Sequence, residues 1–472
     1  MSEPAEPYDL VVIGAGPAGE KAAAAAAFWG KRVAVVDRSP IPGGAMVGGA
    51  VASKTMREAA LYLTSFRQRD LYEVGLGLTP DTAAERLHRR TDEVVSMMAE
   101  AAAENLRRHG VDVVRGTARL GPGDRTVRVR PLGDGSGGGR TLQAPAILVA
   151  TGSTPFHPPG VPFDDPDVLD SDDAALLDRP LRSLVVVGGG AVGCEFASIF
   201  TALGASVVLV DSRDRLLPFM DVEIADELER TFTSVGLRVV HGAGRVTAAR
   251  DATGRLAVHL AATGETLAPE KVIFATGRVG NTAELGLADA GVTTDDAGRI
   301  VVDEHYRTTA PGISAAGDVI GPPALASVSM EQARTAVRWA LDLPRKDAAA
   351  DHLAPYGVYT VPEAAMVGLT EAAAVAAGHD VGVGRARFAV NTRAAISGAT
   401  DGLLKLVFER TDLRLLGVHV LGDSATELVH LGQAVLHFGG TIEHFVHSTF
   451  NVPTLSEAYK YAAYDGLGRV GR

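Results

Sequence analysis

Short apolar runs that lead into glycine-rich turns mark the ends of predicted strands in this chain. Residues 8–13 form one such run, which leads into Gly14-Ala15-Gly16-Pro17-Ala18-Gly19, and the alanine-rich stretch 20–29 predicts a buried helix. A second apolar run over 31–36 ends at Asp37, 23 residues after the first glycine of the turn. Strand, glycine turn, helix, strand and acidic residue, in this order, are typical of a dinucleotide-binding unit.

The residue types in this unit suit a bound dinucleotide. Gly14, Gly16 and Gly19 permit a tight turn and let the backbone approach a pyrophosphate, and the helix N-terminus adds N–H donors and partial positive charge. Asp37 is placed to accept hydrogen bonds from a ribose.

The same pattern recurs in the middle of the chain. An apolar run over 184–187 leads into Gly188-Gly189-Gly190-Ala191-Val192-Gly193, a predicted helix extends to Leu203, and a strand over 206–210 ends at Asp211. This acidic residue also follows the first glycine of its turn by 23 residues. One such turn is a weak signal, but two complete copies predict two dinucleotide sites.

Two further apolar runs end in small-residue turns, Thr151-Gly152 and Thr276-Gly277, and we expect them to bracket the second nucleotide-binding domain. The predicted fold class is α/β, with two Rossmann-like dinucleotide-binding domains and a C-terminal α+β dimerisation domain. The expected boundaries are 1–152 for the first domain, 153–277 for the second, 278–350 for a segment completing the first, and 351–472 for the interface domain.

The later part of the chain offers one ambiguous residue. Asp318 follows the apolar run 313–317 and precedes a predicted helix from about Ala324 to Leu341. Its carboxylate could bind a polyol or act as a helix N-cap, and this segment alone does not decide between them. Beyond 351 a hairpin (404–408 with 415–421) and a helix (426–438), without a glycine motif, predict a packing or dimerisation unit.

Composition narrows the class of protein. A net charge of -12 without a basic patch argues against nucleic-acid binding. The one cysteine, Cys194, excludes an intrachain disulfide and fits a cytoplasmic location. No apolar stretch approaches the roughly 20 residues of a membrane span. No His, Asp and Glu spacing suggests a metal site.

The whole chain resembles the flavin-dependent pyridine nucleotide–disulfide oxidoreductase superfamily, and within it the soluble, FAD-containing pyridine nucleotide transhydrogenases. Five phrases support the resemblance: Gly19-Glu20-Lys21-Ala22-Ala23, Cys194-Glu195-Phe196-Ala197-Ser198-Ile199-Phe200, Arg213-Asp214-Arg215-Leu216-Leu217, Tyr359-Thr360-Val361-Pro362-Glu363 and Thr449-Phe450-Asn451-Val452-Pro453-Thr454-Leu455-Ser456-Glu457-Ala458-Tyr459. The last phrase is the most specific.

The resemblance implies which residues bind the cofactors. The first glycine turn with Asp37 would hold the ADP half of FAD, Thr151 and Gly152 would lie along the FAD, and Asp318 would bind its ribityl chain. The residues that would hold NAD(P)H are Gly188, Gly190, Gly193, Asp211, Arg213 and Gly277.

The resemblance also implies an ion pair at the reacting centre. Lys54 would lie near flavin N5 with Glu195 as its partner, although Lys54 considered alone would be interpreted as a solvated surface lysine. A cation near N5 stabilises the reduced, anionic flavin, and a buried lysine needs a carboxylate to stay charged.

Two departures from the superfamily pattern exclude disulfide reduction. The redox-active cysteine positions fall near Met46 and Ala50, in a stretch that is one residue shorter than in the superfamily and contains no cysteine. The histidine of the C-terminal dyad is replaced by Val452, whereas its glutamate partner, the candidate catalytic residue Glu457, remains. Thiol chemistry therefore lacks both its nucleophiles and its acid–base catalyst.

We therefore predict an FAD-dependent enzyme that passes hydride from NAD(P)H to a second nicotinamide nucleotide. One alternative is an NAD(P)H:quinone or acceptor reductase (diaphorase), or a specialised dihydrolipoamide-dehydrogenase-like biosynthetic flavoenzyme, with a substrate space lined by Met46, Val47 and Ala50. Another is a flavin-bearing regulatory subunit, against which the intact Lys54 and Glu195 argue.

Nucleotide preference stays open at this level. Asp211 favours NAD, because a carboxylate binds the 2′-hydroxyl and repels a 2′-phosphate, but Arg213 and Arg215 could grip a phosphate. On this interpretation Asp211→Asn should improve the use of NADPH. The resemblance also implies an antiparallel homodimer in which residues 450–457 of one subunit complete the flavin site of the other. His447 is interpreted as a surface or interface residue.

Overall fold

The computed structural model describes residues 6–39, 43–44, 46–64, 79–123, 125–132, 139–175, 177, 179–344 and 353–471. The chain divides into two compact units, which are described separately. The first comprises residues 1–52, 91–156 and 278–349, and the second comprises 53–90, 157–277 and 350–472.

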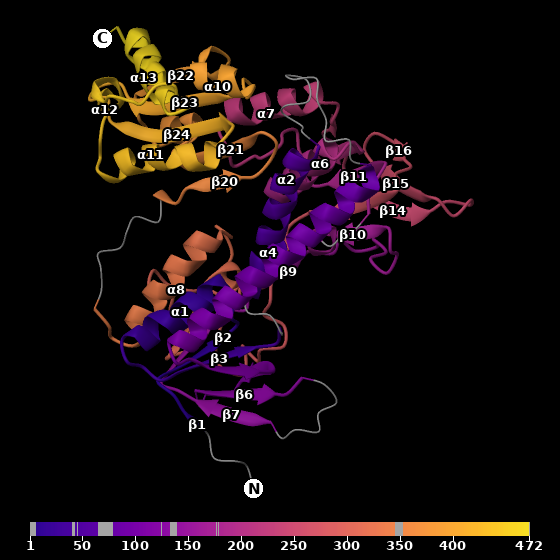
Figure 1. Ribbon diagram of the computed structural model, residues 1–472. Coiled ribbons are helices and arrows are strands. Elements are labelled where there is room, and N and C mark those ends of the chain that lie inside the picture. Colours follow the sequence, from indigo (N-terminus) through magenta and orange to yellow (C-terminus); the bar gives the residue numbers. More distant parts are fainter. Residues whose placement is uncertain are drawn as a thin grey trace. The chain divides into compact units, whose positions relative to one another are not determined.

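A parallel five-stranded sheet forms the centre of the first unit. Its order is β19 (Ile313–Ala315), β8 (Ala146–Val149), β2 (Leu10–Ile13), β3 (Val33–Asp37) and β4 (Asp112–Arg115). Because side chains alternate along a strand, β2 contributes to two cores. Leu10 and Val12 pack towards α1 (Pro17–Phe28) and α8 (Ala326–Ala340), which lie side by side on the sheet (Figure 1).

The opposite face of this sheet is covered by a second, smaller sheet. Val11 and Ile13 of β2 belong to the core between the two sheets. The strand order of the smaller sheet is β1 (Glu6–Pro7), β7 (Arg140–Gln143), β6 (Thr126–Arg130) and β5 (Thr117–Leu120). The unit also contains an antiparallel pair, β9 (Ser153–Pro155) with β18 (Arg278–Gly280), and the helical turns η1 (Met46–Val51) and η2 (Asp318–Ile320). The helix α4 (Pro80–Arg108) contributes residues to both units.

The second unit begins with another parallel five-stranded sheet. Its order is β10 (Val168–Asp170), β17 (Lys271–Phe274), β11 (Ser183–Val187), β12 (Ser206–Val210) and β13 (Arg238–Val240). Its helices are α2 (Ala52–Leu63), α5 (Ser171–Ala174), α6 (Ala191–Ala202) and α7 (Val222–Ser234), and a small antiparallel sheet follows as β14 (Val246–Arg250), β15 (Leu256–Leu260) and β16 (Thr266–Leu267). The two parallel sheets confirm the predicted pair of Rossmann-like folds.

An antiparallel sheet dominates the C-terminal part of the second unit (Figure 1). Its order is β20 (Tyr356–Val358), β21 (Glu363–Gly368), β24 (Leu415–Gly422), β23 (Leu403–Glu409) and β22 (Val381–Arg387), with α9 (Glu371–Ala376), η4 (Phe388–Val390), α10 (Thr392–Ser397) and α12 (Glu443–His447) around it. The helices α11 (Ala425–His437) and α13 (Glu457–Arg469) pack together, since the Tyr459 hydroxyl donates to the Leu428 carbonyl at 2.7 Å. The hairpin predicted over 404–421 is confirmed as β23–β24.

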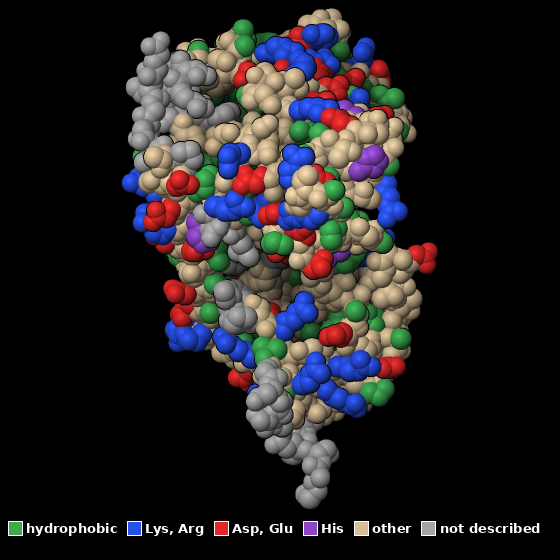
Figure 2. All heavy atoms as spheres, turned by 90° about the vertical axis from the view of Figure 1, so that its right-hand side faces the viewer, with side chains coloured by type: hydrophobic (Ala, Val, Ile, Leu, Met, Phe, Trp, Pro, Cys, Tyr) green, Lys and Arg blue, Asp and Glu red, His purple; other side chains and the backbone are tan. Residues whose placement is uncertain are grey.

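The charged surface is mixed in sign. Figure 2 shows Lys and Arg side chains next to Asp and Glu side chains over the face that it draws. Exposed pairs such as Arg238–Glu265 are screened by solvent, so they add little to stability. Within the described residues, no helix has the length and apolarity needed to cross a membrane.

Candidate functional site

The first glycine turn assigns a different task to each of its three glycines. Gly14 has a φ of 103°, and a Cβ there would lie 2.3 Å from the Ala150 carbonyl oxygen. A Cβ on Gly19 would lie 1.8 Å from the Gly14 carbonyl oxygen, so the helix could not approach the strand. A Cβ on Gly16 would meet nothing within 4 Å, and no side chain caps α1, which begins just after it. The turn thus leaves open space and uncapped N–H groups, which fit a pyrophosphate.

The second glycine turn repeats this arrangement. Gly188 has a φ of 117°, and its Cβ would lie 2.4 Å from the Ala275 carbonyl oxygen. A Cβ on Gly193 would lie 1.7 Å from the Gly188 carbonyl oxygen, whereas one on Gly190 would meet nothing within 4 Å. No side chain caps α6 at its start, so this turn also fits a pyrophosphate. Gly277, after β17, has a φ of 122° and open space at its Cβ position.

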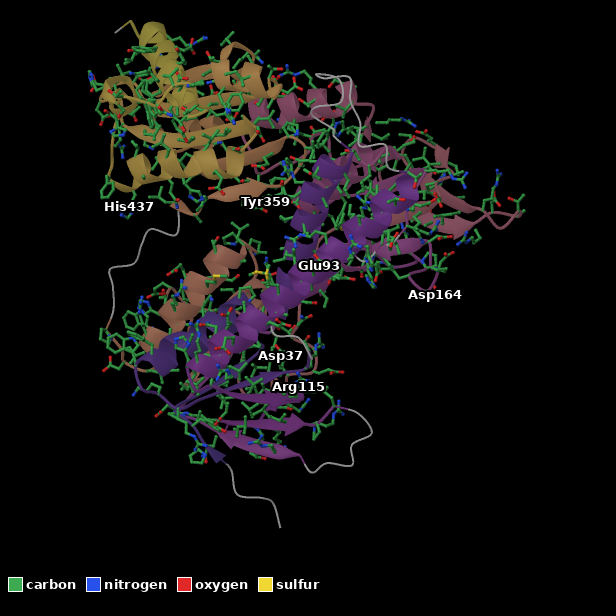
Figure 3. The ribbon with its side chains drawn as sticks, viewed as in Figure 1. Asp37, Glu93, Arg115, Asp164, Tyr359 and His437 are labelled. Carbon is green, nitrogen blue, oxygen red and sulfur yellow. The ribbon has the colours of Figure 1, made fainter. Side chains whose placement is uncertain are left out.

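The acidic residue after each motif is held by its own glycine turn. Asp37 ends β3 beside Arg115 of β4 (Figure 3), and it accepts from Ala15 N at 2.5 Å and Ser39 N at 2.7 Å. Asp211 accepts from Gly189 N and makes three further hydrogen bonds with Arg213. Burial opposes ionisation of Asp211, but these bonds outweigh it and its pKa lies below its ordinary value.

Asp318 is not the N-cap of the following helix. It lies in η2, and α8 begins only at Ala326 with Leu325 as its N-cap. The Asp318 carboxylate instead accepts from the Ser153 hydroxyl at 2.8 Å, and that hydroxyl accepts from Arg278 Nε at 2.9 Å. The cap interpretation is therefore wrong, and a fixed carboxylate is left that can accept from a polyol.

Thr151 and Gly152 lie where the chain leaves the first predicted nucleotide-binding domain, and they are hydrogen-bonded to Asn281, which lies where the chain returns to it. The Thr151 hydroxyl donates to the Asn281 carbonyl at 2.8 Å, and the Asn281 side chain donates back to the Thr151 carbonyl at 2.9 Å. Asn281 N also donates to the Gly152 carbonyl at 2.9 Å. These two residues therefore have a structural role that the sequence did not reveal.

Lys54 and Glu195 form the expected ion pair. Lys54 Nζ on α2 lies 2.7 Å from Glu195 Oε2 on α6, and the side chains are 30% and 6% exposed. The other carboxylate oxygen accepts from Tyr359 N at 2.9 Å, and Lys54 Nζ lies 5.0 Å from the centre of the Tyr359 ring. Tyr359 connects β20 and β21 (Figure 3). Lys54 is therefore fixed by its neighbours and is not a solvated surface lysine.

Arg57 is a functional candidate that the sequence analysis missed. It lies one turn after Lys54 on α2 and is only 2% exposed. Its Nε donates to the Thr360 carbonyl at 2.8 Å, and its Nη1 lies 3.1 Å from Glu363. These contacts form a closed ring that starts and ends on α2: Lys54 binds Glu195, Glu195 binds the 359–360 backbone, and that backbone binds Arg57. Two features of the sequence could have indicated Arg57: its position three residues after Lys54, and the Tyr359–Glu363 phrase, which contains its partners.

Among the described residues, neither Glu457 nor Val452 makes a hydrogen bond or ion pair with Lys54 or Glu195. The Glu457 carboxylate, at the start of α13, accepts from Thr454 N in the preceding loop at 3.3 Å. Val452 replaces the dyad histidine with a side chain that is 64% exposed. The side chains of Met46 and Val47 lie outside the described residues, and Cys194 is buried on α6, where burial raises the pKa of its thiol.

Comparisons with known proteins agree with this geometry. The family model described as pyridine nucleotide-disulphide oxidoreductase matches residues 8–338, and the model of the dimerisation domain of that family matches 354–463. A soluble pyridine nucleotide transhydrogenase of Mycobacterium bovis is 41% identical over 465 residues, covering 98% of both chains. The transhydrogenase of the same name from Hahella chejuensis is 39% identical over 476 residues, covering 98% of this chain and 99% of its own.

Two solved structures have the same fold. LpdA of Mycobacterium tuberculosis superposes with a TM-score of 0.87 at 28% identity, covering 97% of this chain and 99% of its own. RclA of Escherichia coli, an HOCl-induced flavoprotein disulfide reductase, superposes with a TM-score of 0.85 at 27% identity and the same coverage.

Proposed function

Because the chain belongs to the pyridine nucleotide–disulphide oxidoreductase family, we propose that it transfers hydride between nicotinamide nucleotides through FAD, as a transhydrogenase. The observation that carries the proposal is the presence of two complete dinucleotide motifs in a chain with one buried cysteine. FAD, when bound, supplies a group that accepts hydride from one nucleotide and gives it to another.

The residues of this chain would bind the two cofactors, orient them and supply charge near the flavin ring. Gly16, Asp37 and Asp318 would hold FAD, and the turn at Gly190, next to the Asp211–Arg213 pair, would hold the nicotinamide nucleotide. The Lys54–Glu195 pair would supply a fixed positive charge for the flavin ring, because Glu195 keeps the ammonium in one position. The matched dimerisation domain supports a homodimer, in which the segment containing Glu457 would complete the partner's site.

Reduction of a quinone is the second candidate function. The specific observation in its favour is the exchange of a proton-carrying histidine for the exposed, apolar Val452. Ala50, at the position of a cysteine, is exposed as well. Both changes favour an apolar acceptor over a disulfide.

Anaerobic turnover of the FAD-loaded protein with NADPH and thio-NAD⁺, with a naphthoquinone assayed in parallel, tests the two candidates. Fast transfer to thio-NAD⁺ with slow quinone reduction is the expected result. Brisk quinone reduction with negligible transfer to thio-NAD⁺ would support the second candidate. If neither nucleotide reduces the bound FAD, the chain is not an oxidoreductase, and a regulatory role replaces both.

We also place the reaction in the cytoplasm. The support is chemical, because the reduced nucleotides that the enzyme would consume are made inside cells, and the single cysteine needs no oxidising compartment. Fractionation of the source cells tests this, and recovery of the protein outside the cytoplasmic fraction would contradict it.

A further inference from the structure

The two dinucleotide motifs differ at the residue two positions after their acidic residue. Ser39 follows Asp37 in the first motif, and Arg213 follows Asp211 in the second. In both motifs the backbone N–H of that residue donates to the acidic side chain at 2.7 Å. Only the second motif adds a guanidinium to this contact, so the two carboxylates have different capacities to bind a ribose.

Asp37 keeps acceptor capacity for a ligand, but Asp211 does not. A carboxylate offers about four lone-pair sites. Among the residues that the structure describes, Asp37 uses two of them, one for Ala15 N and one for Ser39 N. Asp211 uses all four: Oδ1 accepts from N and Nε of Arg213, at 2.7 and 2.9 Å, and Oδ2 accepts from Gly189 N and from Arg213 Nη2, the latter at 2.6 Å. Asp211 is also only 3% exposed.

The backbone around Arg213 fixes this arrangement. Gly242 N donates to the Arg213 carbonyl at 3.0 Å, and Leu217 N donates to the Gly189 carbonyl at 2.8 Å. The loop after β12 is therefore folded back on the glycine turn. Arg215, the other basic residue of this loop, lies 3.2 Å from Asp226 and makes no contact with Asp211 in the part of the chain that is described.

The solvent-exposed side of the Asp211–Arg213 pair is cationic. The Arg213 side chain is 45% exposed, and its contact with Asp211 occupies Nε and one N–H of Nη2. Three of the five guanidinium N–H donors therefore have no partner among the described residues. A guanidinium with free donors is a good ligand for a phosphate, which it can bind with two parallel hydrogen bonds.

We infer that Arg213 sets the nucleotide specificity of the second motif: it occupies and neutralises Asp211, so that the site accepts nicotinamide nucleotides with and without a 2′-phosphate. The inference rests on the proposed function only in taking this motif as the nicotinamide nucleotide site. The sequence left the preference open between Asp211, which favours NAD, and the nearby arginines, which could grip a phosphate. A carboxylate already saturated by its own arginine neither binds the 2′-hydroxyl nor repels a 2′-phosphate.

Binding of two fragments without nicotinamide, 2′,5′-ADP and 5′-AMP, to the FAD-loaded protein tests this by calorimetry. We expect the wild-type dissociation constants to differ by less than about tenfold, since charge-assisted hydrogen bonds to the phosphate offset the cost of its desolvation. Arg213→Ser, which copies the first motif, should weaken 2′,5′-ADP relative to 5′-AMP by about tenfold to hundredfold. Arg213→Lys should keep most of the wild-type ratio, because it keeps the charge.

Asp211→Asn shows whether Arg213 neutralises Asp211. The variant is tested in the Arg213→Ser background, where the Asp211 carboxylate has lost its arginine: if Arg213 neutralises Asp211, Asp211→Asn should restore part of the 2′,5′-ADP affinity there, and an unchanged ratio would contradict the neutralisation. Arg238→Ser is the matched control: Arg238 also grips a carboxylate, Glu265, with two 2.7 Å bonds in the same unit, and its loss should not change the ratio. Thermal unfolding and FAD content of each variant verify the fold.

Two further results would overturn the inference. One is a wild-type protein that binds 5′-AMP more than a hundredfold more tightly than 2′,5′-ADP, and the other is an Arg213→Ser variant whose ratio equals that of the wild type or the control. Because no hydride moves in these titrations, they remain informative if the protein fails as a transhydrogenase. Failure of the proposed function and failure of this inference are therefore distinguishable.

Discussion

Lys54 and Glu195 are 141 positions apart in the sequence, yet the ammonium nitrogen of one lies 2.7 Å from a carboxylate oxygen of the other. The pair joins α2 to α6, and its geometry depends on the backbone of Tyr359, which binds the second carboxylate oxygen. A charge held in this way needs no reorganisation when a reaction occurs nearby.

Removing the negative charge of this pair should slow reduction of the bound flavin. Glu195→Gln keeps the size of the side chain and its acceptor oxygen but no longer holds Lys54 electrostatically. We expect the rate of reduction by NADPH to fall about tenfold to hundredfold, in line with the loss of one electrostatic contact at a reacting centre. Anaerobic stopped-flow absorbance measures it. Glu265→Gln, at an exposed pair with Arg238, should react as the wild type does, and an equal loss there would refute the account.

Arg57 should act on the reaction through Lys54, as a positioning residue. Arg57→Gln opens the ring of contacts between α2 and the 359–360 backbone, so we expect slower flavin reduction in the wild-type background. In a Lys54→Met background the same change should have almost no further effect, because coupled residues are non-additive. Additive losses in this double-mutant cycle would show that Arg57 has only a structural role.

The same substitution should also destabilise the fold. Glu363 is buried and would lose its cation, which costs about 3 kcal/mol for a broken buried pair. Its bonds from Thr426 N and the Thr426 hydroxyl remain and limit the damage. Urea denaturation gives the free energy of unfolding.

Ser153 should control FAD affinity by orienting Asp318. Asp318→Asn removes a charged acceptor, and we expect FAD binding to weaken about tenfold to hundredfold. Ser153→Ala should weaken it less, by about threefold to tenfold, since a neutral hydrogen bond is lost. Titration of the apoprotein with FAD, followed by quenching of flavin fluorescence, measures both. Thr309→Ala, an exposed hydroxyl in the same unit, serves as control, and weakening there would remove the explanation.

His419 should make the protein less stable as the pH falls below neutrality. It is fully buried on β24, and burial lowers its pKa below the ordinary value of 6.5, although the nearby Asp221 opposes this shift. Its Nε2 donates to the Leu369 carbonyl at 3.0 Å, and its other surroundings include Lys405 and Glu371. Folded His419 therefore stays neutral in a range where the unfolded chain binds a proton, so stability falls with falling pH.

This dependence can be isolated by comparing variants. His419→Gln keeps a donor for the Leu369 carbonyl and cannot titrate, so it should lose less stability than the wild type from pH 6.5 downwards. Urea midpoints at about pH 7.5 and below about 6.5 measure the difference. His430→Gln, an exposed position on α11, should follow the wild type, and parallel curves for all three proteins would contradict the assignment.

The fold was predictable where backbone geometry dictates the residue type. In each glycine turn the first glycine has a positive φ and the last has no room for a Cβ, as Gly14 and Gly19 show for the first turn. Both turns could therefore be recognised in the sequence, together with their strands and helices. The strands around them are short, buried and apolar, which is the pattern of a parallel sheet covered on both faces.

The site was predictable only in part, because its contacts join distant segments. The Lys54–Glu195 pair followed from the resemblance alone, and the Arg57–Thr360 contact joins residues 303 positions apart, which no pattern of neighbouring residues pairs with each other. The spacing of Asp211 and Arg213 was visible, but the number of bonds between them was not. On our inference that number decides what the sequence left open, because an arginine that saturates the neighbouring carboxylate removes its preference for a 2′-hydroxyl.

Cys194, the only sulfhydryl of the chain, is fully buried on α6, and burial raises the pKa of its thiol. An enzyme that moves electrons without sulfur has no exposed thiolate for peroxide to oxidise, so peroxide should not stop it by the route that disables thiol enzymes. Oxidative stress would leave this route open while thiol-dependent relatives stop.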